Sequence, residues 1–492
     1  MTDTPSGTGG VVSERLTSDL PVTDADAAAD LVADDATVLV SGFGSVGYPK
    51  AVPLALAESG RDLELTVVSG GSVGEEIDVA LVEAGGITRR YPFQTSKQAQ
   101  TAANEGRIAF SDRSVGSLAD EVQYGGLVDS DTAVVEAVAV GEDWFIPSTS
   151  IGQTPAFVDA APELIVEVNR AQPLALQSVH DIYRPDAPPN REPIPLTDPG
   201  GQIGSPRITF DPTKLVAVVE TDRSDTPYSF RDPTEADHAI ATNLGEFLEQ
   251  ELDRSAVFDE QLHLQFGVGS LGNALMGELT DLNVGDREMI YFGEVIQDGL
   301  LDMLDSGRLE SASATALALS AEGQIRLFDD IERYAEDIVL RPTDISNNPA
   351  LIDRFGVVGV NSALEVDIYG NVNSTHVGGT RVLNGVGGSL DFNGNSLVAV
   401  CALPSTLKDG DISRIVPLTP HVDHTEHDID VFVTEQGIAD VRGCSPVERA
   451  ERLIDECAHP DYRASLREYL DAAKERGGHI PHDFERALDW LN

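Results

Sequence analysis

The stretch that decides the fold reads TVLV (37–40), SGFGSVGYP (41–49), KAVPLALAE (50–58) and LELTVV (63–68). Its first and last pieces are rich in apolar and β-branched residues, which is typical of buried strands. The Ala- and Leu-rich piece between them predicts a helix, and the glycines after the first strand predict a tight turn. A strand–helix–strand unit of this kind favours a parallel sheet covered by helices.

The same alternation continues along most of the chain. Further strands are expected at 132–140, 164–168 and 215–220 in the first half and at 262–266, 289–292, 357–360, 364–368, 397–402 and 430–433 in the second. Further helices are expected at 24–32, 75–84 and 238–252 and from Pro446 onward. The predicted fold class is therefore α/β, built of open and mostly parallel sheets.

Chain length and two breaks in this pattern predict two tandem domains. A chain of 492 residues exceeds one ordinary core of about 250 residues. Residues 1–19 are polar and rich in Gly, Ser and Thr, which predicts a flexible arm. The charged, proline-containing segment 221–236 precedes a helix, so we place the boundary there, between domains 20–225 and 226–492. A proline cluster at 181–206 predicts a loop excursion from the first domain.

The chain is strongly acidic. It holds 83 Asp and Glu against 33 Lys and Arg, a formal charge of -50. This charge repels phosphate backbones and excludes nucleic acid as a partner. Because the acid is spread out and 41% of residues are hydrophobic, we expect a folded protein with an acidic shell. Scarce lysine is typical of halophilic adaptation to a high-salt cytoplasm, with an unusually acidic mesophile as the alternative.

Two further sequence features bear on the compartment. The cysteines Cys401, Cys444 and Cys457 are odd in number and lack metal-ligand spacing, so all three are expected to be reduced. No run approaches the roughly 20 apolar residues of a membrane span. The start of the chain lacks the basic and apolar regions of a signal peptide. We expect a cytoplasmic protein without a membrane partner.

A glycine motif follows the first strand. Gly42-Phe-Gly44-Ser-Val-Gly47 matches the dinucleotide fingerprint, which also needs an acidic residue at the end of the second strand to bind ribose. The second strand ends in Ser69-Gly70-Gly71, and Glu64 lies at its other end. A tight turn with a structural or substrate-facing role is favoured over a dinucleotide site.

A histidine-rich segment, His421-Val-Asp-His-Thr-Glu-His-Asp428, has the residue types of a metal site. Histidines at steps of three fit neither the i, i+4 pair of a zinc protease helix nor a zinc finger. Polar packing or hydrogen bonding in a loop is the favoured interpretation, and no metal is expected.

The most informative candidate is Met289-Ile-Tyr-Phe-Gly-Glu294, where a strand enters a glycine turn and a helix predicted at 295–304. The Glu294 carboxylate is thereby placed at the carboxyl end of a strand, where open α/β folds place their sites. In a dry pocket a carboxylate is a useful nucleophile. The alternative is a carboxylate facing a helix dipole. Glycine-rich loops at 267–270 and 384–389 either bind phosphates and oxyanions or are plain turns.

In their order along the chain, these motifs resemble the acetyl-CoA hydrolase/transferase family of class I CoA-transferases, in its succinyl-CoA:acetate branch and in a haloarchaeal-like version. The likeness covers nearly the whole chain. It rests on residues 41–53, 91–94, 146–152 and 180–183 in the first half and on 293–299, 345–349, 365–377, 384–388, 421–427 and 434–437 in the second. The resemblance implies two tandem domains of the CoA-transferase type and a homodimer.

The resemblance also implies a mechanism. Glu294 attacks an acyl-CoA thioester to give an acyl-glutamyl anhydride and CoA thiolate, which then form a glutamyl-CoA thioester that an acceptor carboxylate resolves. The backbone amides of Val268 and Gly388 are implied as oxyanion donors, and Asn347 and Glu435 as residues lining the site. Implied CoA contacts are Gly267, Val268, Gly269, Ser270, Leu271, Leu364, Asn384, Gly388 and Lys408.

The substrates implied are acyl-CoA and small carboxylates such as acetate, succinate or propionate. CoA is then a substrate, and no cofactor is expected. The alternative function is an acyl-CoA hydrolase at the same site, in which water takes the acyl group. A transferase must exclude water from its pocket, whereas a hydrolase must admit it. A silent CoA-binding sensor is a third alternative, which the intact Glu294 disfavours.

Overall fold

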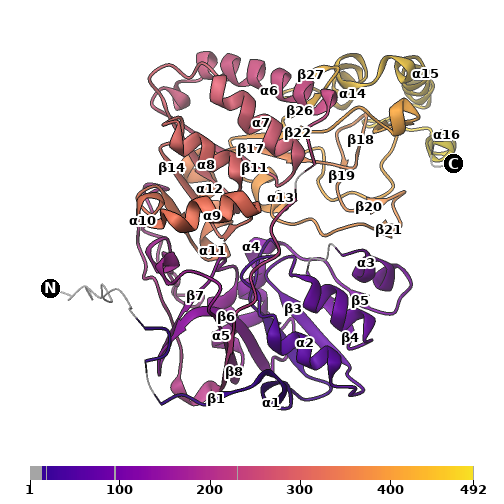
Figure 1. Cartoon of the computed structure of the whole chain (residues 1–492). Coiled ribbons are helices and arrows are strands. Elements are labelled where there is room, and N and C mark those ends of the chain that lie inside the picture. Colours follow the sequence, from indigo (N-terminus) through magenta and orange to yellow (C-terminus); the bar gives the residue numbers. More distant parts are fainter. Residues whose placement is uncertain (1–13, 18, 93–95, 230, 491–492) are drawn as a thin grey trace. The chain divides into compact units, whose positions relative to one another are not determined.

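The computed structural model describes residues 14–17, 19–92, 96–229 and 231–490 (Figure 1). Residues 1–13 of the predicted arm, and positions 93–94 of one family motif, lie outside the described part. The end of the arm is held in place, because the guanidinium of Arg15 donates to the carbonyls of Val138 at 3.0 Å and Gln172 at 2.7 Å. Arg15, within the predicted arm, is therefore anchored to unit 1.

The chain divides into two compact units. Unit 1 comprises Met1–Tyr228, Tyr291–Leu301 and Ser311–Leu351, and unit 2 comprises Ser229–Ile290, Asp302–Glu310 and Ile352–Asn492. The two later segments group with unit 1 because the amide of Ile151 donates to the carbonyl of Thr315 at 2.9 Å and the amide of Leu317 donates to that of Thr149 at 3.0 Å. The predicted domain limits, 20–225 and 226–492, stay a prediction.

Unit 1 is built on a sheet whose main path runs β1-β10-β8-β6-β2-β3-β4-β5. Its strands are β1 (Val22–Thr23), β10 (Leu215–Thr221), β8 (Glu163–Asn169), β6 (Thr132–Val140), β2 (Thr37–Val40), β3 (Leu65–Ser69), β4 (Ile87–Tyr91) and β5 (Ala109–Phe110). All neighbours on this path are parallel. The central strand β6 is buried along its whole length, as its continuous apolar sequence predicts.

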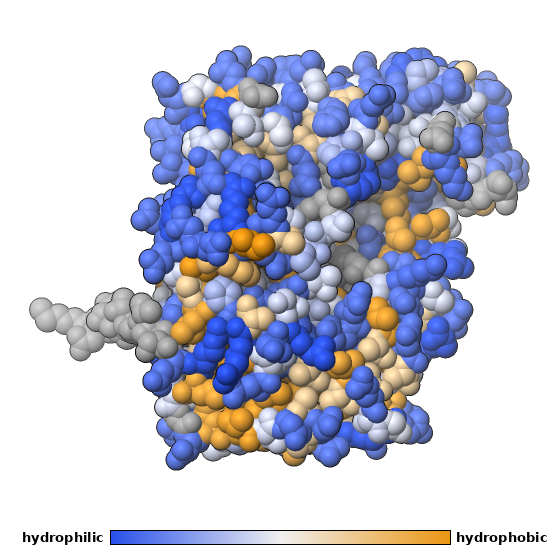
Figure 2. All heavy atoms as spheres, viewed as in Figure 1, coloured by the Kyte–Doolittle hydropathy of each residue, from blue (hydrophilic) through white to orange (hydrophobic). Residues whose placement is uncertain are grey.

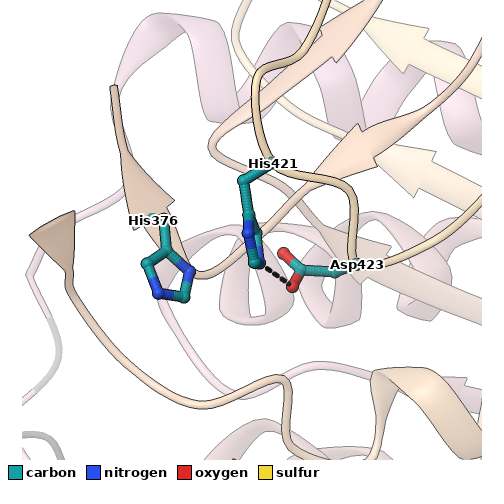
Figure 3. A group of neighbouring side chains, drawn as sticks. All are labelled: His376, His421 and Asp423. Carbon is teal, nitrogen blue, oxygen red and sulfur yellow. Dashed lines mark hydrogen bonds and ion pairs between the residues drawn. The ribbon is translucent and has the colours of Figure 1, made fainter. Parts of the chain in front are cut away.

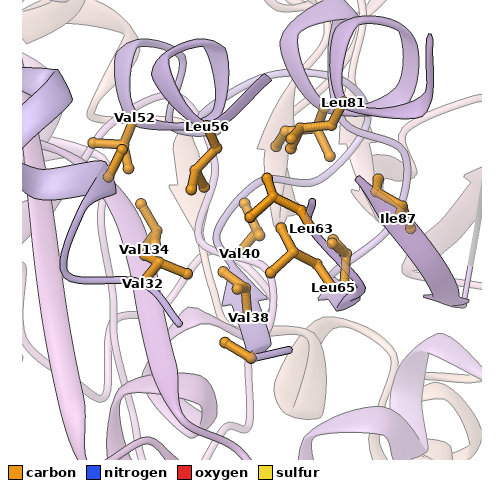
Figure 4. Packing of buried hydrophobic residues seen from close by; sticks show 14 of the residues in the cluster. Val32, Val38, Val40, Val52, Leu56, Leu63, Leu65, Leu81, Ile87 and Val134 are labelled. Atoms are coloured by element: carbon orange, nitrogen blue, oxygen red, sulfur yellow. The ribbon is translucent and has the colours of Figure 1, made fainter. Parts of the chain in front are cut away.

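One core of unit 1 lies between this sheet and the helices that follow β2 and β3. Alternate strand residues such as Val40 and Leu65 meet Val52 and Leu56 of α2 (Ala51–Glu58) and Leu81 of the π-helical turn Glu76–Leu81 (Figure 4). Burial of one such side chain contributes about 1.5–3 kcal/mol. The predicted strand–helix–strand unit is therefore confirmed in residue detail.

The later segments of unit 1 contain β13 (Val295–Ile296), β14 (Ser311–Ala314), β15 (Ala316–Leu317), β16 (Ile338–Leu340) and the short helix α11 (Thr343–Ser346), and β12 (Glu288–Phe292) leads into them. Strands β14 and β16 are parallel, as are β13 and β15. The helix predicted at 295–304 was wrong at its start, because residues 295–296 pair with β15 and α8 (Asp298–Asp305) begins only afterwards.

Unit 2 contains the strand order β11-β17-β22-β26-β27. These strands are β11 (Gln261–Phe266), β17 (Val358–Ser362), β22 (Val398–Ala402), β26 (Val431–Thr434) and β27 (Gly437–Asp440). The first four are parallel, and β26 and β27 form an antiparallel hairpin. Helix α6 (Glu235–Arg254) packs against α7 (Ser270–Asp281) and begins earlier than predicted, because Thr234 and Asp237 form a capping box.

The remaining expectations concern the ends of the elements and the surface. The tail is helical as predicted, with α14 (Pro446–Arg452), α15 (Pro460–Arg476) and α16 (Phe484–Asp489). The proline-rich excursion is ordered, since Asp181 pairs with the buried Arg341 and accepts from the amide of Ile203. Hydrophilic side chains cover most of the face drawn in Figure 2. Among the described residues, every helix is too short or too polar to span a bilayer.

The substitution Leu65→Ala tests the unit 1 core. Leu65 is 1% exposed and belongs to the cluster between β3 and the helices, so its truncation should lower the free energy of unfolding by about 2–5 kcal/mol. The measurement is denaturant unfolding followed by circular dichroism. Leu31→Ala, at a residue 48% exposed, is the control and should change the free energy by no more than about 0.5 kcal/mol. Equal effects of the two substitutions would contradict this packing.

Candidate active site

Glu294 lies in unit 1 directly after β12, with its backbone fixed on both sides. The amide of Gly293 donates to the carbonyl of Ser313 at 3.0 Å, and the Glu294 carbonyl accepts from the amides of Thr315 at 2.8 Å and Ala316 at 3.1 Å. A Cβ at position 293 would lie 2.5 Å from the Tyr291 ring, so only glycine fits between the strand and Glu294. The fold therefore holds Glu294 in one orientation at the end of a strand.

The Glu294 carboxylate is oriented by an amide. Asn347, which follows α11 and is fully buried, donates from Nδ2 to Glu294 Oε1 at 2.7 Å, and its own Oδ1 accepts from Ser346 Oγ at 2.8 Å. A hydrogen bond to the ionised form favours that form. Burial is the main cause that raises the pKa of the Tyr291 phenol, and the nearby charge of Glu294 raises it further. Because Glu294 itself is only half-buried, its oriented carboxylate is also reachable.

The helix-dipole alternative for Glu294 does not fit this geometry. Helix α8 begins at Asp298, and Glu294 is separated from it by the strand β13. The Asp298 carboxylate takes the expected place in the first helical turn and accepts from the amide of Ser320 at 2.9 Å. Glu294 therefore lies outside the first turn of α8.

An apolar cluster lies against the segment that carries Glu294. Val295 follows Glu294 in the chain, and the amide of Ala316 donates to the Glu294 carbonyl. Both side chains belong to a cluster with residues of the glycine motif after β2 and of other parts of unit 1: Phe43, Val46, Val115, Ala318 and Tyr228. Such a wall lowers the local dielectric and strengthens every charge interaction of the carboxylate.

The glycine motif itself is a packed turn. A Cβ on Gly42 would lie 2.6 Å from Tyr48 Cβ, and one on Gly47 would lie 2.3 Å from Ser150 Oγ. The Gly44 carbonyl accepts from the Tyr228 hydroxyl at 2.7 Å. These close approaches explain the glycines without a dinucleotide, and they favour the structural interpretation made from the sequence.

Beneath this turn lies a buried ion-pair network that the sequence did not reveal. The ammonium of Lys50 contacts Glu136 at 2.6 Å and Asp225 at 2.8 Å, and all three side chains are at most 1% exposed. Asp225 also accepts from the Thr149 hydroxyl at 2.5 Å, and Glu136 from that of Ser148 at 2.5 Å. The network joins β6 and the turn after β2 to the segment that holds residues 315–317.

The unit 2 residues predicted to act lie largely at one edge of its sheet. Gly267 follows β11, Leu364 follows β17 and Glu435 follows β26. Because these strands are parallel, their carboxyl ends share an edge, where α/β sheets bind ligands. Ser405, after β22, completes the row and was missed from the sequence, although a small polar residue just past a strand is a signal of this kind.

Glu435 is an ionised carboxylate with fixed partners. Its oxygens accept from the Ser405 amide at 2.7 Å, from the Ser405 hydroxyl and from the Gln436 side chain at 3.0 Å. Burial acts to raise the pKa of Glu435, but these hydrogen bonds outweigh it and lower the pKa below its usual value.

The predicted loops expose groups suited to a charged ligand. Val268 is 44% exposed, and Gly269 (φ 142°) adopts a conformation that only glycine takes easily before Ser270 and Leu271 open α7. Gly388 is buried and precedes α13 (Ser389–Asn393). Asn384 Oδ1 is buried and makes no hydrogen bond within the described part of the chain.

Lys408 combines an exposed cation with a strained backbone. Its φ of 51° lies in the left-handed region, which among the non-glycine residues described here only Ser45, in the first glycine turn, shares. Such strain costs about 1–3 kcal/mol and clusters at functional sites. Of the two residues, Ser45 lies in the glycine motif that follows the first strand, and Lys408 is one of the predicted CoA contacts.

The three histidines of the 421–428 segment do not converge. His421 pairs with Asp423 at 2.9 Å, His424 is buried with its Nε2 3.2 Å from Ser389 Oγ, and the side chain of His427 is 81% exposed. Their separation agrees with polar loop packing for this motif. The structure instead places His376, from a distant segment, beside His421.

The substitutions Asn347→Ala and Asn347→Asp test the hydrogen bond to Glu294. Loss of a hydrogen bond to a charged group costs about 1.5–3 kcal/mol, so kcat/KM should fall about 10–100-fold in the alanine variant. The aspartate adds a like charge, which raises the pKa of Glu294 and moves the acidic limb of the pH profile of kcat/KM to higher pH. Asn190→Ala, at an exposed loop residue, is the control. An unshifted acidic limb in the aspartate variant would contradict this arrangement.

Comparison with known proteins places the chain in a family. The model of the acetyl-CoA hydrolase/transferase N-terminal domain matches residues 20–220, and that of the C-terminal domain matches residues 323–470. The chain is 43% identical to a succinyl-CoA:acetate CoA-transferase of Clostridium kluyveri over 95% of this chain and 88% of that protein. It is 38% identical to an acetyl-CoA hydrolase of Yarrowia lipolytica over 91% of this chain and 90% of that protein.

Solved structures show the same fold at lower identity. RipA from Yersinia pestis matches with a TM-score of 0.71 at 22% identity, covering 93% of this chain and 97% of that one. A 4-hydroxybutyrate CoA-transferase from Porphyromonas gingivalis matches with a TM-score of 0.62 at 21% identity, covering 92% and 97%. The predicted α/β fold of the CoA-transferase type is confirmed, and the chain belongs to the acetyl-CoA hydrolase/transferase family.

Proposed function

We propose that this protein transfers CoA between small carboxylic acids through a covalent intermediate on Glu294. The observation that carries the proposal is the Glu294 carboxylate, held at a strand end by the Asn347 amide at 2.7 Å. The 43% identity to a succinyl-CoA:acetate CoA-transferase supports acetate and succinate as substrates, with propionate as a further candidate.

The proposed reaction runs in balanced steps. Glu294 Oε attacks the thioester carbonyl of acyl-CoA, the carbon–sulfur bond breaks, and an acyl-glutamyl anhydride and CoA thiolate form. The thiolate then attacks the glutamyl carbonyl, which releases the first carboxylate and leaves a glutamyl-CoA thioester. An acceptor carboxylate reverses both steps and leaves as the new acyl-CoA. No proton is consumed over the cycle.

Each step passes through an oxyanion that backbone amides can stabilise. We propose the amides of Val268 and Gly388 as the donors, each worth about 3–4 kcal/mol. Glu435 is proposed to line the site as a permanently charged group, which its hydrogen bonds and lowered pKa support.

CoA carries phosphates into an acidic protein, so local compensation is needed. We propose that Lys408, the loop Gly267–Leu271, Leu364, Asn384 and Gly388 contact CoA. The exposed ammonium of Lys408 offers a positive charge. The buried Oδ1 of Asn384, which accepts no hydrogen bond from the described residues, offers an acceptor to a ligand N–H or O–H group.

A hydrolase at the same site is the second candidate, and the 38% identity to an acetyl-CoA hydrolase favours it. In that reaction water resolves the glutamyl thioester. The decisive measurement follows new acyl-CoA and free thiol together after succinyl-CoA is added with and without acetate. New acetyl-CoA that requires acetate, with little free thiol, identifies a transferase. Thiol release that is indifferent to acetate identifies a hydrolase.

The substitution Glu294→Gln tests the nucleophile. Glutamine keeps the shape and an oxygen that can accept from Asn347 but cannot form the anhydride, so turnover should fall at least about 10³-fold with the thermal midpoint unchanged. Incubation of the wild type with acyl-CoA alone should add the mass of CoA less one water to the peptide that contains Glu294, because one carboxylate oxygen leaves with the released acid. Glu288→Gln, on the exposed start of β12, is the matched control. Substantial turnover in the Glu294→Gln variant would refute the mechanism.

We also propose the setting: a homodimer in the cytoplasm of a salt-loving cell. The formal charge of -50 supports the high-salt part of this proposal. Repulsion among surface carboxylates reaches only about 3 Å at 1 M salt, whereas it reaches about 10 Å at 0.1 M.

The thermal midpoint should therefore rise steeply between 0.1 and 2 M KCl, and more than in sucrose, which stabilises without screening charge. Light scattering after gel filtration in 2 M KCl should give twice the chain mass of 52.4 kDa. A midpoint independent of KCl, or a monomer in 2 M KCl, would contradict the respective part of this proposal.

A further inference from the structure

Three side chains converge in unit 2 outside the residues proposed to act on CoA. His376 belongs to β20 (His376–Val377), and His421 and Asp423 lie in the loop between β25 (Ile415–Val416) and β26 (Figure 3). One potential ligand atom from each lies within 4.8 Å of the other two. The two imidazole rings are 4.0 Å apart between centroids, and His421 Nε2 is 2.9 Å from Asp423 Oδ1.

The partners of these side chains resemble the outer shell of a metal site. Thr375 Oγ1 lies 2.7 Å from His376 Nδ1, which fixes the orientation of that ring. Asp423 Oδ2 accepts from the Ser374 amide at 2.6 Å and from its hydroxyl at 3.2 Å, while Thr375 Oγ1 contacts Asp423 Oδ1 at 2.8 Å. Hydrogen bonds of this kind orient the ligands of protein metal sites.

The residue types of the cluster also suit a cation. An imidazole offers a nitrogen lone pair and a carboxylate offers an oxygen, and these are the atoms that bind metal.

We propose that His376, His421 and Asp423 bind a divalent transition metal of the zinc class. Two imidazoles and one carboxylate are ligands of zinc and its neighbours rather than of Mg²⁺ or Ca²⁺. The 2.9 Å between His421 Nε2 and Asp423 Oδ1 is already near the roughly 3.3 Å edge of a tetrahedron with bonds of about 2.0–2.1 Å. The His421 side chain is 35% exposed, so water completes the coordination.

The site would hold the loop that carries Asn384 and Gly388. The amide of Leu383 donates to the carbonyl of Thr375 at 2.8 Å, next to His376, and Ser389 Oγ lies 3.2 Å from His424, next to Asp423. Both ends of this loop are therefore tied to the segments that supply the ligands. A role in CoA binding rests on the proposed function, whereas binding of the metal does not.

The visible absorption of bound Co²⁺ tests the site directly. Metal is first removed from the full chain with a chelator, and Co²⁺ is then added in 2 M KCl with excess Mg²⁺, which occupies exposed carboxylates. Wild type should develop visible bands that saturate at one equivalent of Co²⁺ and are abolished by Zn²⁺. His376→Ala and His421→Ala should each weaken Co²⁺ binding at least about tenfold. His427→Ala, an exposed histidine of the same loop, should bind as wild type.

Circular dichroism of the metal-free variants checks that they fold, and the conservative pair His376→Gln and His421→Gln replaces any alanine variant that does not. The absence of saturable bands in the wild type would overturn the proposal. So would Co²⁺ affinities of the His376 and His421 variants that equal the affinity of the wild type, and the cluster would then be a hydrogen-bonded loop contact. Glu294→Gln should bind Co²⁺ normally, so failure of the proposed activity and failure of the metal site are separable. Added Zn²⁺ should lower the KM for acyl-CoA more than it changes kcat.

Discussion

The buried ammonium of Lys50 is the interaction on which unit 1 depends. It contacts both Glu136 and Asp225 in the interior, and these carboxylates in turn hold the hydroxyls of Ser148 and Thr149. Removing the Lys50 ammonium would leave buried carboxylates without a counter-charge, at a cost of about 3–5 kcal/mol. Through the backbone of the 148–151 segment, the network fixes residues 315–317 and, with them, the carbonyl of Glu294.

Glu294, the proposed nucleophile, is thus positioned by backbone rather than by its side-chain rotamer alone. The amides of Thr315 and Ala316 hold the peptide of Glu294, and Asn347 orients the carboxylate. Two layers of support suit the proposed reaction, in which the same carboxylate would attack, carry an acyl group and carry CoA in turn. Precise placement of a reacting group is itself a large part of catalysis.

The acidic composition makes each cation informative. Only five lysines occur in the chain, and they serve different purposes: Lys50 is buried as a structural counter-ion, whereas Lys408 is exposed on a strained turn. The fully buried Arg341 likewise anchors the proline-rich excursion through Asp181. Lys50 and Arg341 are thus buried where interior carboxylates need a counter-charge.

The sequence by itself determined the α/β class, most strand positions and Glu294 as a candidate, because strands, turns and strand ends are written in local patterns of residues. It could not place the start of α8, since the pairing of residues 295–296 with β15 overrides their helical pattern. Only the tertiary structure brought Asn347 to Glu294, Lys50 to Glu136 and His376 to His421. Contacts between residues far apart in the chain depend on how the elements pack, which no local pattern specifies.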